Sequence, residues 1–117
     1  MRIQLALISF LSFLATAEII EFKEDTNVDE MLNQHEFSVV NYYDNSEKSQ
    51  EINKLFELFH NKFTEGQKNG NIVHRDVGWY SCNIEELPGL PKLVDGTNQI
   101  VAPKKGNVKH AFNLVPP

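Results

Sequence analysis

The 117-residue chain contains one cysteine and few cations, and each scarcity excludes a class of protein. A single cysteine excludes an intrachain disulfide framework, a paired-cysteine redox site and a zinc knuckle. Lysine and arginine number 11 against 16 acidic residues, so the formal net charge is −5. So acidic a chain offers little to a phosphate backbone, which excludes nucleic-acid binding. The remaining composition, 41% hydrophobic and 23% charged, is typical of one packed domain.

The apolar residues are concentrated at the N-terminus. Arg2 is a minimal positive region, residues 3–14 form an apolar stretch of secretory length, and Ala15-Thr16-Ala17 is a small-residue cleavage site. This pattern resembles a signal peptide over residues 1–17, which predicts the endoplasmic reticulum lumen or the extracellular space. The alternative is an uncleaved anchor that contacts a membrane through residues 3–20, near the lower length limit for a spanning helix.

The next part of the chain alternates strand and helix patterns. Residues 18–22 are β-prone, and Asp25 or Thr26 can cap a short helix over about 27–34. The run 37–43 is rich in β-branched and aromatic residues and is too short for a helix, so it predicts a buried central strand.

The clearest pattern is a long amphipathic helix over about 47–65, with Gly66 where a C-cap glycine belongs. We expect its apolar stripe to pack on Val39, Val40 and Tyr42 of the central strand. The stripe recurs at spacings of three and four residues: Ile52, Leu55, Phe56, Phe59 and Phe63.

The second half of the chain contains shorter elements. The patterns predict a strand over 71–77, a short helix over 81–87 that Pro88-Gly89 ends, and a hairpin whose arms 91–95 and 99–102 flank Asp95-Gly96-Thr97-Asn98. This order predicts an α/β fold with a mixed central sheet and helices on both faces. Residues 18–102 then form the domain, and residues 103–117 form a tail without a helix.

The order and spacing resemble the thioredoxin-like family, specifically a domain of the protein disulfide isomerase kind. In that family a central strand ends in Phe-Tyr, similar to Val39-Val40-Asn41-Tyr42-Tyr43 here, and a redox Cys-x-x-Cys opens the next helix. A later strand that ends in Asp is similar to residues 72–77, and Leu90-Pro91-Lys92 resembles the family's cis-proline. The resemblance implies a thioredoxin-like sandwich whose C-terminal helix is short or missing, which would leave one sheet face open to a partner.

The departure from the family is at the redox motif. Where the two cysteines belong, the chain has Ser46, Glu47, Lys48, Ser49 and Gln50. Thiol–disulfide exchange needs a thiolate of lowered pKa and a second sulfur, and neither is present. The sequence therefore predicts a degenerate redox site, no catalytic residue and no cofactor.

The other candidate side chains suggest no enzyme site. Cys82 is either a small buried hydrophobe or a thiol for an intermolecular disulfide. The four histidines show no metal-ligand spacing, so no metal site is expected. The spacing places His74 and Asp76 on one face of the predicted strand over 71–77, where a hydrogen bond between them is expected but defines no catalytic pair.

Two functions follow from these predictions. In the first, the chain is a redox-inactive thioredoxin-like protein that binds other proteins in the secretory pathway. In the second, an uncleaved N-terminal helix holds it as a structural accessory subunit of a membrane complex, for example a respiratory-chain assembly. Both give the chain a protein partner. A thiol oxidoreductase is a third and weaker hypothesis, because the chain lacks the paired cysteines.

Overall fold

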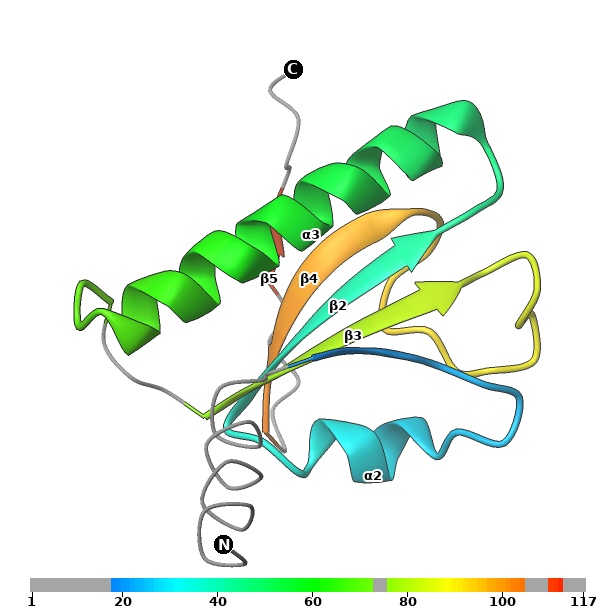
Figure 1. Ribbon diagram of the computed structural model, residues 1–117. Coiled ribbons are helices and arrows are strands. Elements are labelled where there is room, and N and C mark those ends of the chain that lie inside the picture. The colour runs from blue at the N-terminus through cyan, green and yellow to red at the C-terminus, as the bar shows by residue number, and fades with distance from the viewer. Residues whose placement is uncertain (1–17, 73–75, 105–109, 113–117) are drawn as a thin grey trace, which may run out of the picture.

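The computed structural model describes residues 18–72, 76–104 and 110–112, so the predicted signal peptide or anchor over 1–17 lies outside them. None of the helices in these ranges is long and apolar enough to cross a membrane. Within the same ranges the chain forms five strands and two helices (Figure 1). In chain order they are β1 (Ile19–Glu21), α2 (Val28–Leu32), β2 (Phe37–Tyr43), α3 (Glu47–Lys68), β3 (Val77–Asn83), β4 (Asn98–Pro103) and β5 (His110–Phe112).

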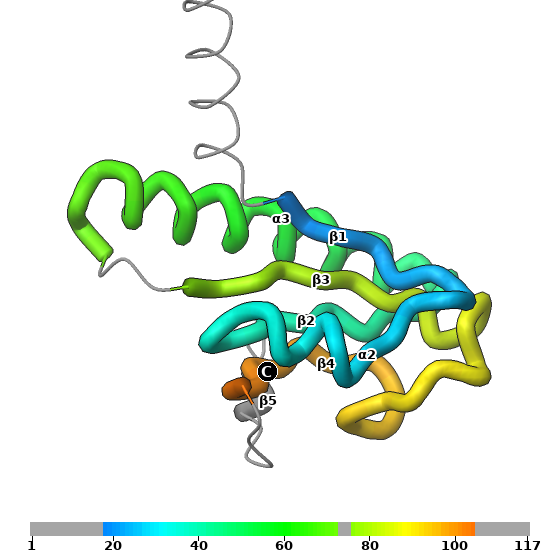
Figure 2. The backbone as a smooth tube through the Cα atoms, turned by 90° about the horizontal axis from the view of Figure 1, so that it is seen from below, coloured from blue at the N-terminus to red at the C-terminus, as the bar shows by residue number. Residues whose placement is uncertain are grey.

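The strands form one mixed sheet with the spatial order β1-β3-β2-β4-β5. Strand β2 is central and runs parallel to β3, from Phe37 opposite Val77 to Tyr43 opposite Asn83. Strand β1 also runs parallel to β3, whereas β4 is antiparallel to β2 and β5 is antiparallel to β4. Figures 1 and 2 together show α3 on one face of the sheet and α2 on the other. The predicted α/β class, mixed sheet and central strand are confirmed.

The face under α3 is built around Trp79 of β3, which is 2% exposed. Its ring lies edge-on to the rings of Phe56 and Phe63, at centroid distances of 6.0 and 5.4 Å. Val39 of β2 joins this cluster. The prediction that Val40 would also lie under α3 is wrong, as is the same prediction for Tyr42. Alternate residues of a strand point to opposite faces, and both side chains belong to the core on the α2 side.

The face under α2 is covered by α2 and by an irregular segment after β3. Val40, Tyr42, Tyr80 and Ile100 are completely buried there. The expectation of an open sheet face is therefore wrong in the described part of the chain, although no helix follows α3 within it. The apolar side chains of the irregular segment supply the cover: Ile84, Leu87, Leu90, Leu93 and Val94.

Each helix begins at a capping side chain. Asn27, and not Asp25 or Thr26, is the N-cap of α2, and its side chain accepts a hydrogen bond from the Glu30 N–H at 3.1 Å. The predicted start of α3 is confirmed, because Ser46 is its N-cap. Both caps satisfy a backbone donor that the first helical turn leaves without a partner.

The end of α3 differs from the prediction. The helix runs past Gly66 to Lys68, and Gly70, with φ of 79°, takes the left-handed position. The Asn71 N–H donates to the Gly66 carbonyl at 2.8 Å, and the Gly70 N–H donates to the Gln67 carbonyl at 3.2 Å, as in a Schellman motif. Gly66 serves close packing instead, since a Cβ there would lie 2.5 Å from Cδ1 of Ile72.

Strand β3 lies further along the chain than the prediction of 71–77, over Val77–Asn83; residues 71, 72 and 76 lie outside it, and residues 73–75 are not among the described residues. Gly78 looks like a break in the sequence, but it is buried within the strand. A Cβ there would clash with the His35 ring and would lie 2.7 Å from the Tyr80 hydroxyl. Glycine is therefore required by close contacts on the α2 face and does not end the strand.

Two predicted elements of the second half are wrong. The helix over 81–87 does not form, because 81–83 belong to β3 and the Asn83 side chain then accepts the N–H groups of Glu85 and Glu86 in a turn. Residues 91–95 form no strand, and the Leu93 N–H donates to the Tyr42 hydroxyl at 3.2 Å instead. The antiparallel partner of β4 is β5, from the segment predicted to be a tail.

Candidate functional site

The residues that stand in place of redox cysteines begin α3, directly after β2. Oγ of Ser46 accepts a hydrogen bond from the Ser49 N–H at 3.1 Å. Oδ1 of Asp44 accepts from the Ser46 N–H at 2.9 Å, and the Asp44 N–H donates to Oγ of Ser49 at 3.1 Å. The hydrogen bonds with Ser46 hold the pKa of the Asp44 carboxyl below its usual range. The three side chains thus close a ring of hydrogen bonds around the helix start.

The segment after β3 also contacts this helix start. A carboxylate oxygen of Glu85 accepts a hydrogen bond from the Asn45 N–H at 2.9 Å, and the Asn83 side chain donates to Oδ1 of Asn45 at 2.8 Å. Asn83 lies opposite Tyr43 in the parallel ladder, so the ends of β2 and β3 bring these residues together. No local sequence pattern could predict these two contacts, because 38 to 40 residues separate the partners.

This arrangement has the chemistry of a helix cap and not of a thiol site. Of the degenerate motif, Ser49 is buried, whereas Ser46, Glu47, Lys48 and Gln50 are exposed. No sulfur is present among them. A thiolate gains stability at a helix N-terminus from backbone N–H donors and positive partial charge. Here serine and carboxylate oxygens of the chain already accept from donors at the helix start.

Cys82 lies on β3 with its side chain in the core on the α2 side. It is 1% exposed, and burial raises the pKa of its thiol above the usual range, helped by the nearby charge of Glu21. A reactive cysteine needs the opposite conditions, a lowered pKa and access to solvent. The structure therefore places Cys82 as a packing group, the first of the two alternatives that its sequence left open.

Pro91 does not have the predicted cis geometry. The peptide bonds of the described residues are all trans, including the bond before Pro91. In the resemblance this proline directly precedes a strand, whereas β4 begins only at Asn98. Pro91 instead lies in the irregular segment whose leucines cover the α2-side core. The cis-proline assignment is therefore wrong.

A hydrogen-bonded pair that the sequence did not predict joins His35 to Asp76. Nδ1 of His35 lies 2.7 Å from Oδ1 of Asp76, and the Glu36 N–H donates to the other carboxylate oxygen at 3.2 Å. The contact with His35 lowers the pKa of the Asp76 carboxyl. The predicted partner, His74, lies outside the described residues. Within those residues no group of three or more His, Cys, Asp or Glu side chains could hold a metal ion.

Polar side chains also line the gap between α3 and the sheet. Asn41 donates to Oδ1 of Asn53 on α3 at 2.8 Å and accepts from the side chain of Gln99 on β4 at 2.9 Å. Beside this row the Tyr43 hydroxyl donates to Glu21 of β1 at 2.8 Å. Burial raises the pKa of the Glu21 carboxyl and of the Tyr43 phenol. A polar residue inside an apolar strand, such as Asn41, was the signal that could have pointed to this row.

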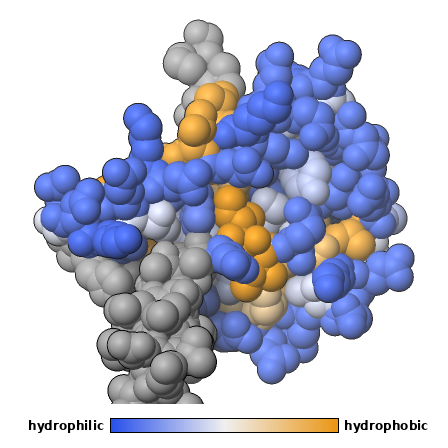
Figure 3. Space-filling model, in the orientation of Figure 1, coloured by the Kyte–Doolittle hydropathy of each residue, from blue (hydrophilic) through white to orange (hydrophobic). Residues whose placement is uncertain are grey.

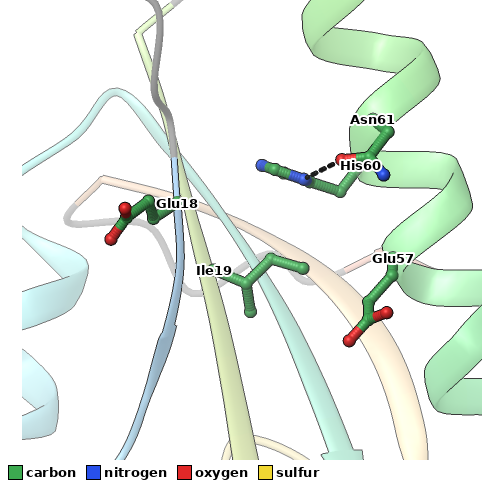
Figure 4. Close-up of a pocket in the computed structure, with 5 residues that line it drawn as sticks. All are labelled: Glu18, Ile19, Glu57, His60 and Asn61. Atoms are coloured by element: carbon green, nitrogen blue, oxygen red, sulfur yellow. Dashed lines mark hydrogen bonds between the residues drawn. The ribbon is translucent and has the colours of Figure 1, made fainter. Parts of the chain in front are cut away.

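A shallow hollow of about 400 Å³ lies between the start of β1 and the middle of α3. Figure 4 shows Ile19 directed toward α3, whereas the carboxylate of Glu18 points to the other side of the strand. On α3, Nδ1 of His60 lies 3.2 Å from Oδ1 of Asn61, and Glu57 completes the lining. The hollow is open and mixed in polarity, and it contains no pair of groups arranged for acid–base chemistry.

Comparisons with known proteins give matches among solved structures. No protein-family model matches the chain, and no curated protein sequence matches it either. A zinc-bound form of human ERp44 matches at 20% identity with a TM-score of 0.55, covering 74% of this chain and 25% of that one. Another human ERp44 crystal form matches at 16% identity and a TM-score of 0.59, covering 83% and 26%. A cysteine-to-serine mutant of Entamoeba histolytica thioredoxin matches at 7% identity and a TM-score of 0.54, covering 81% and 85%.

The chain has a thioredoxin-like fold. It spans about a quarter of the length of the two ERp44 structures and most of the length of the thioredoxin. The thioredoxin-like resemblance predicted from the residues is confirmed at the level of fold. With one cysteine in 117 residues, this thioredoxin-like chain has no Cys-x-x-Cys pair.

Proposed function

We propose that this thioredoxin-like protein is a non-catalytic protein-binding module of the secretory pathway. The observation that carries the proposal is the start of α3, where Ser46 and the carboxylates of Asp44 and Glu85 accept backbone N–H groups. A disulfide-exchanging member needs a thiolate at this place and a second sulfur to resolve the mixed disulfide. The chain's one thiol, on Cys82, lies in the core and away from solvent.

The secretory compartment is supported by the N-terminal sequence and by the position of β1. Ile19 and Ile20 pair with Trp79 and Tyr80 in the sheet, so they are not available to a membrane helix. An anchor would then be restricted to residues 3–18, which is shorter than the roughly 17–25 residues that a spanning helix needs. The proposed anchor over 3–20 loses its last two residues, and a cleaved signal peptide becomes the better explanation of the apolar run.

Two measurements on the full chain test the proposal. In an insulin-reduction assay we expect no turnover above the uncatalysed rate, for the wild type and for Cys82→Ala alike, with a thioredoxin as positive control. Turnover that disappears in Cys82→Ala would overturn the non-catalytic assignment. N-terminal sequencing of the protein from secreting cells should give Glu18 as the first residue, whereas a start at Met1 would favour the membrane-anchored accessory subunit.

A third measurement tests protein binding itself. A photo-crosslinking amino acid at exposed positions, such as Leu58 on α3 or Ile20 on β1, should yield discrete adducts in cells that secrete the protein. The adducts should have a reproducible mass, and the positions that give them should lie on one surface of the protein. Uniform weak labelling at every exposed position would contradict a binding module.

A further inference from the structure

A row of polar side chains crosses four strands on the face of the sheet under α3. In the strand register, Glu21 of β1 lies opposite Ser81 of β3. On its other side Ser81 lies opposite Asn41 of β2, which in turn lies opposite Gln99 of β4. Ser81 follows Trp79 by two positions, so both side chains point to the α3 side. A row of this kind costs folding free energy unless each polar group finds a partner.

The Ser81 hydroxyl is the member of this row that lacks a partner in the described part of the chain. The amides of Asn41 and Gln99 bond to each other, and Glu21 accepts from the Tyr43 hydroxyl. No hydrogen bond of the Ser81 side chain is present among the described residues, although Ser81 is only 7% exposed. The large majority of buried side-chain polar groups have a partner, so an unpaired hydroxyl points to a group that arrives from outside.

The Ser81 side chain borders a hollow of about 180 Å³ between α3 and the strands β1, β2 and β3. We call this space the inner hollow, because it is smaller and more enclosed than the hollow of Figure 4. Small-molecule sites occupy about 300–1,000 Å³, so the volume of the inner hollow suits a single side chain better than a cofactor. Its polar lining consists of Glu21, Asn41, Tyr43, Asn53, Glu57 and Ser81.

The charged groups that line the inner hollow are the carboxylates of Glu21 and Glu57. Burial raises the pKa of the Glu21 carboxyl, and the nearby charge of Glu86 raises it further. None of these three carboxylates forms an ion pair within the described residues. Lys54, three residues before Glu57, is the nearest lysine along α3, and it lies outside the lining. The inner hollow is therefore a negatively charged site whose counter-charge the described part of the chain does not supply.

We propose that the inner hollow binds the ammonium group of a lysine side chain from a partner protein. This inference rests on the proposed function, because it names the group by which the partner is recognised. An ammonium carries three donors and no acceptor, and the carboxylates of Glu21 and Glu57 with the Ser81 hydroxyl offer acceptors for all three. Ile19 and Phe56 complete the lining, where they can pack on the methylene stem of the lysine.

The same features disfavour other occupants of the inner hollow. In the part of the chain that the structure describes, no group of three or more His, Cys, Asp or Glu side chains could hold a metal ion. An anion would be repelled by the two lining carboxylates. Figure 3 shows hydrophilic side chains over most of the visible surface, so a partner meets charge and hydrogen-bonding groups more than apolar area. With a net charge of −5, the chain also attracts a basic partner from a distance.

The test follows the backbone amide signals of the isotope-labelled full chain by nuclear magnetic resonance. The protein is titrated with a short peptide that has one lysine between glycines, and separately with the same peptide in which norleucine replaces the lysine. Norleucine keeps the methylene stem and lacks the ammonium. We expect the lysine peptide to shift the signals of Glu57 and Ser81 saturably at millimolar concentration, and the norleucine peptide to leave them unchanged.

Three variants check the contacts with the ammonium group. Glu57→Gln removes an exposed charge and should weaken binding of the lysine peptide by about threefold. Ser81→Ala removes a hydroxyl that has no partner in the described part of the chain, so the fold is retained, and it should also weaken binding by about threefold. The matched control, Glu51→Gln, makes the same change of charge on α3 outside the lining and should bind as the wild type does.

Equal shifts with the lysine and norleucine peptides would overturn the proposal, as would equal binding by the wild type, Glu57→Gln and Ser81→Ala. Tighter binding of free butylamine than of the lysine peptide would assign the inner hollow to a small amine and not to a partner's side chain. Saturable shifts of the same signals with calcium chloride, and none with the lysine peptide, would assign it to a metal ion. None of these results affects the proposed function, which fails instead through insulin turnover or uniform crosslinking.

Discussion

Replacing Cys82 tests whether the chain's one thiol is a packing group or a reactive one. The side chain is 1% exposed and contacts the core on the α2 side, opposite Tyr42 in the ladder with β2. We consider Cys82→Ser and Cys82→Ala in the full chain. The first keeps the size of the side chain but adds a hydroxyl, and the second removes the sulfur.

The structure predicts different losses of unfolding free energy for Cys82→Ser and Cys82→Ala. No hydrogen bond of the Cys82 thiol is present among the described residues, so a serine hydroxyl would be buried without a prepared acceptor. That costs about 2 kcal/mol of unfolding free energy. Loss of the sulfur in Cys82→Ala leaves a small cavity and costs about 1 kcal/mol. Serine should therefore be more destabilising than alanine, by about 4–8 °C in melting temperature.

Urea denaturation of the three proteins, followed by circular dichroism, measures these differences. A second assay follows the reaction of the wild-type thiol with a maleimide under native conditions. If the thiol is exposed only when the core opens, labelling should be slower than for the unfolded chain by at least about 10³-fold. The labelling rate should rise in urea in proportion to the unfolded fraction.

Two results would refute this reasoning. One is native labelling of Cys82 at the rate of the unfolded chain, which would show an accessible thiol. The other is a Cys82→Ser variant as stable as the wild type, because a hydroxyl tolerated at this position implies contact with water. Either result would restore the intermolecular disulfide as an explanation for the cysteine.

Three further predictions concern the helix ends and the carboxyl of β1. Ser46→Ala should lower the unfolding free energy by about 1 kcal/mol, and Ser46→Asp should restore most of it, in urea titrations of both variants. Gly70→Ala should lower the unfolding free energy by about 1 kcal/mol, because Gly70 takes a φ of 79°, whereas Gly66→Ala should not, because its new Cβ meets only the exposed side chain of Ile72, which can turn aside; equal losses in the two variants would contradict this. Burial raises the pKa of Glu21, so the folded state holds more protons above pH 4.5, and stability should fall as the pH rises from 4.5 through the folded pKa. Glu21→Gln should flatten that pH dependence in melting curves, and an unchanged slope would show that Glu21 is not its source.

The elements that the sequence predicted well are those that local patterns define. The residues 38–42 are buried on both faces because β2 is central and covered by α2 and α3. The start of α3 follows from Ser46, since an N-cap acts within four residues. The absence of a Cys-x-x-Cys motif follows from the single cysteine in the sequence and could be predicted without a structure.

The elements that were predicted wrongly depend on contacts between distant residues. Gly78 looked like a strand end, but its lack of a side chain makes room for His35, which lies 43 positions earlier in the numbering. Residues 91–95 looked like a strand, yet their apolar side chains cover the core without joining the sheet. Asp76 pairs with His35, which lies 41 positions earlier in the chain. Such contacts arise only once the chain is folded, so spacing along the sequence could not predict them.

The position of Trp79 makes it an intrinsic fluorescence probe of the packing between α3 and the sheet. It is the only tryptophan of the chain, and its indole lies beneath the side chains of α3, with the His60 ring centroid 4.9 Å away. Emission from this indole should shift to longer wavelength when water reaches it. The intrinsic fluorescence of the unmodified chain therefore reports whether α3 lies on the sheet, without any label.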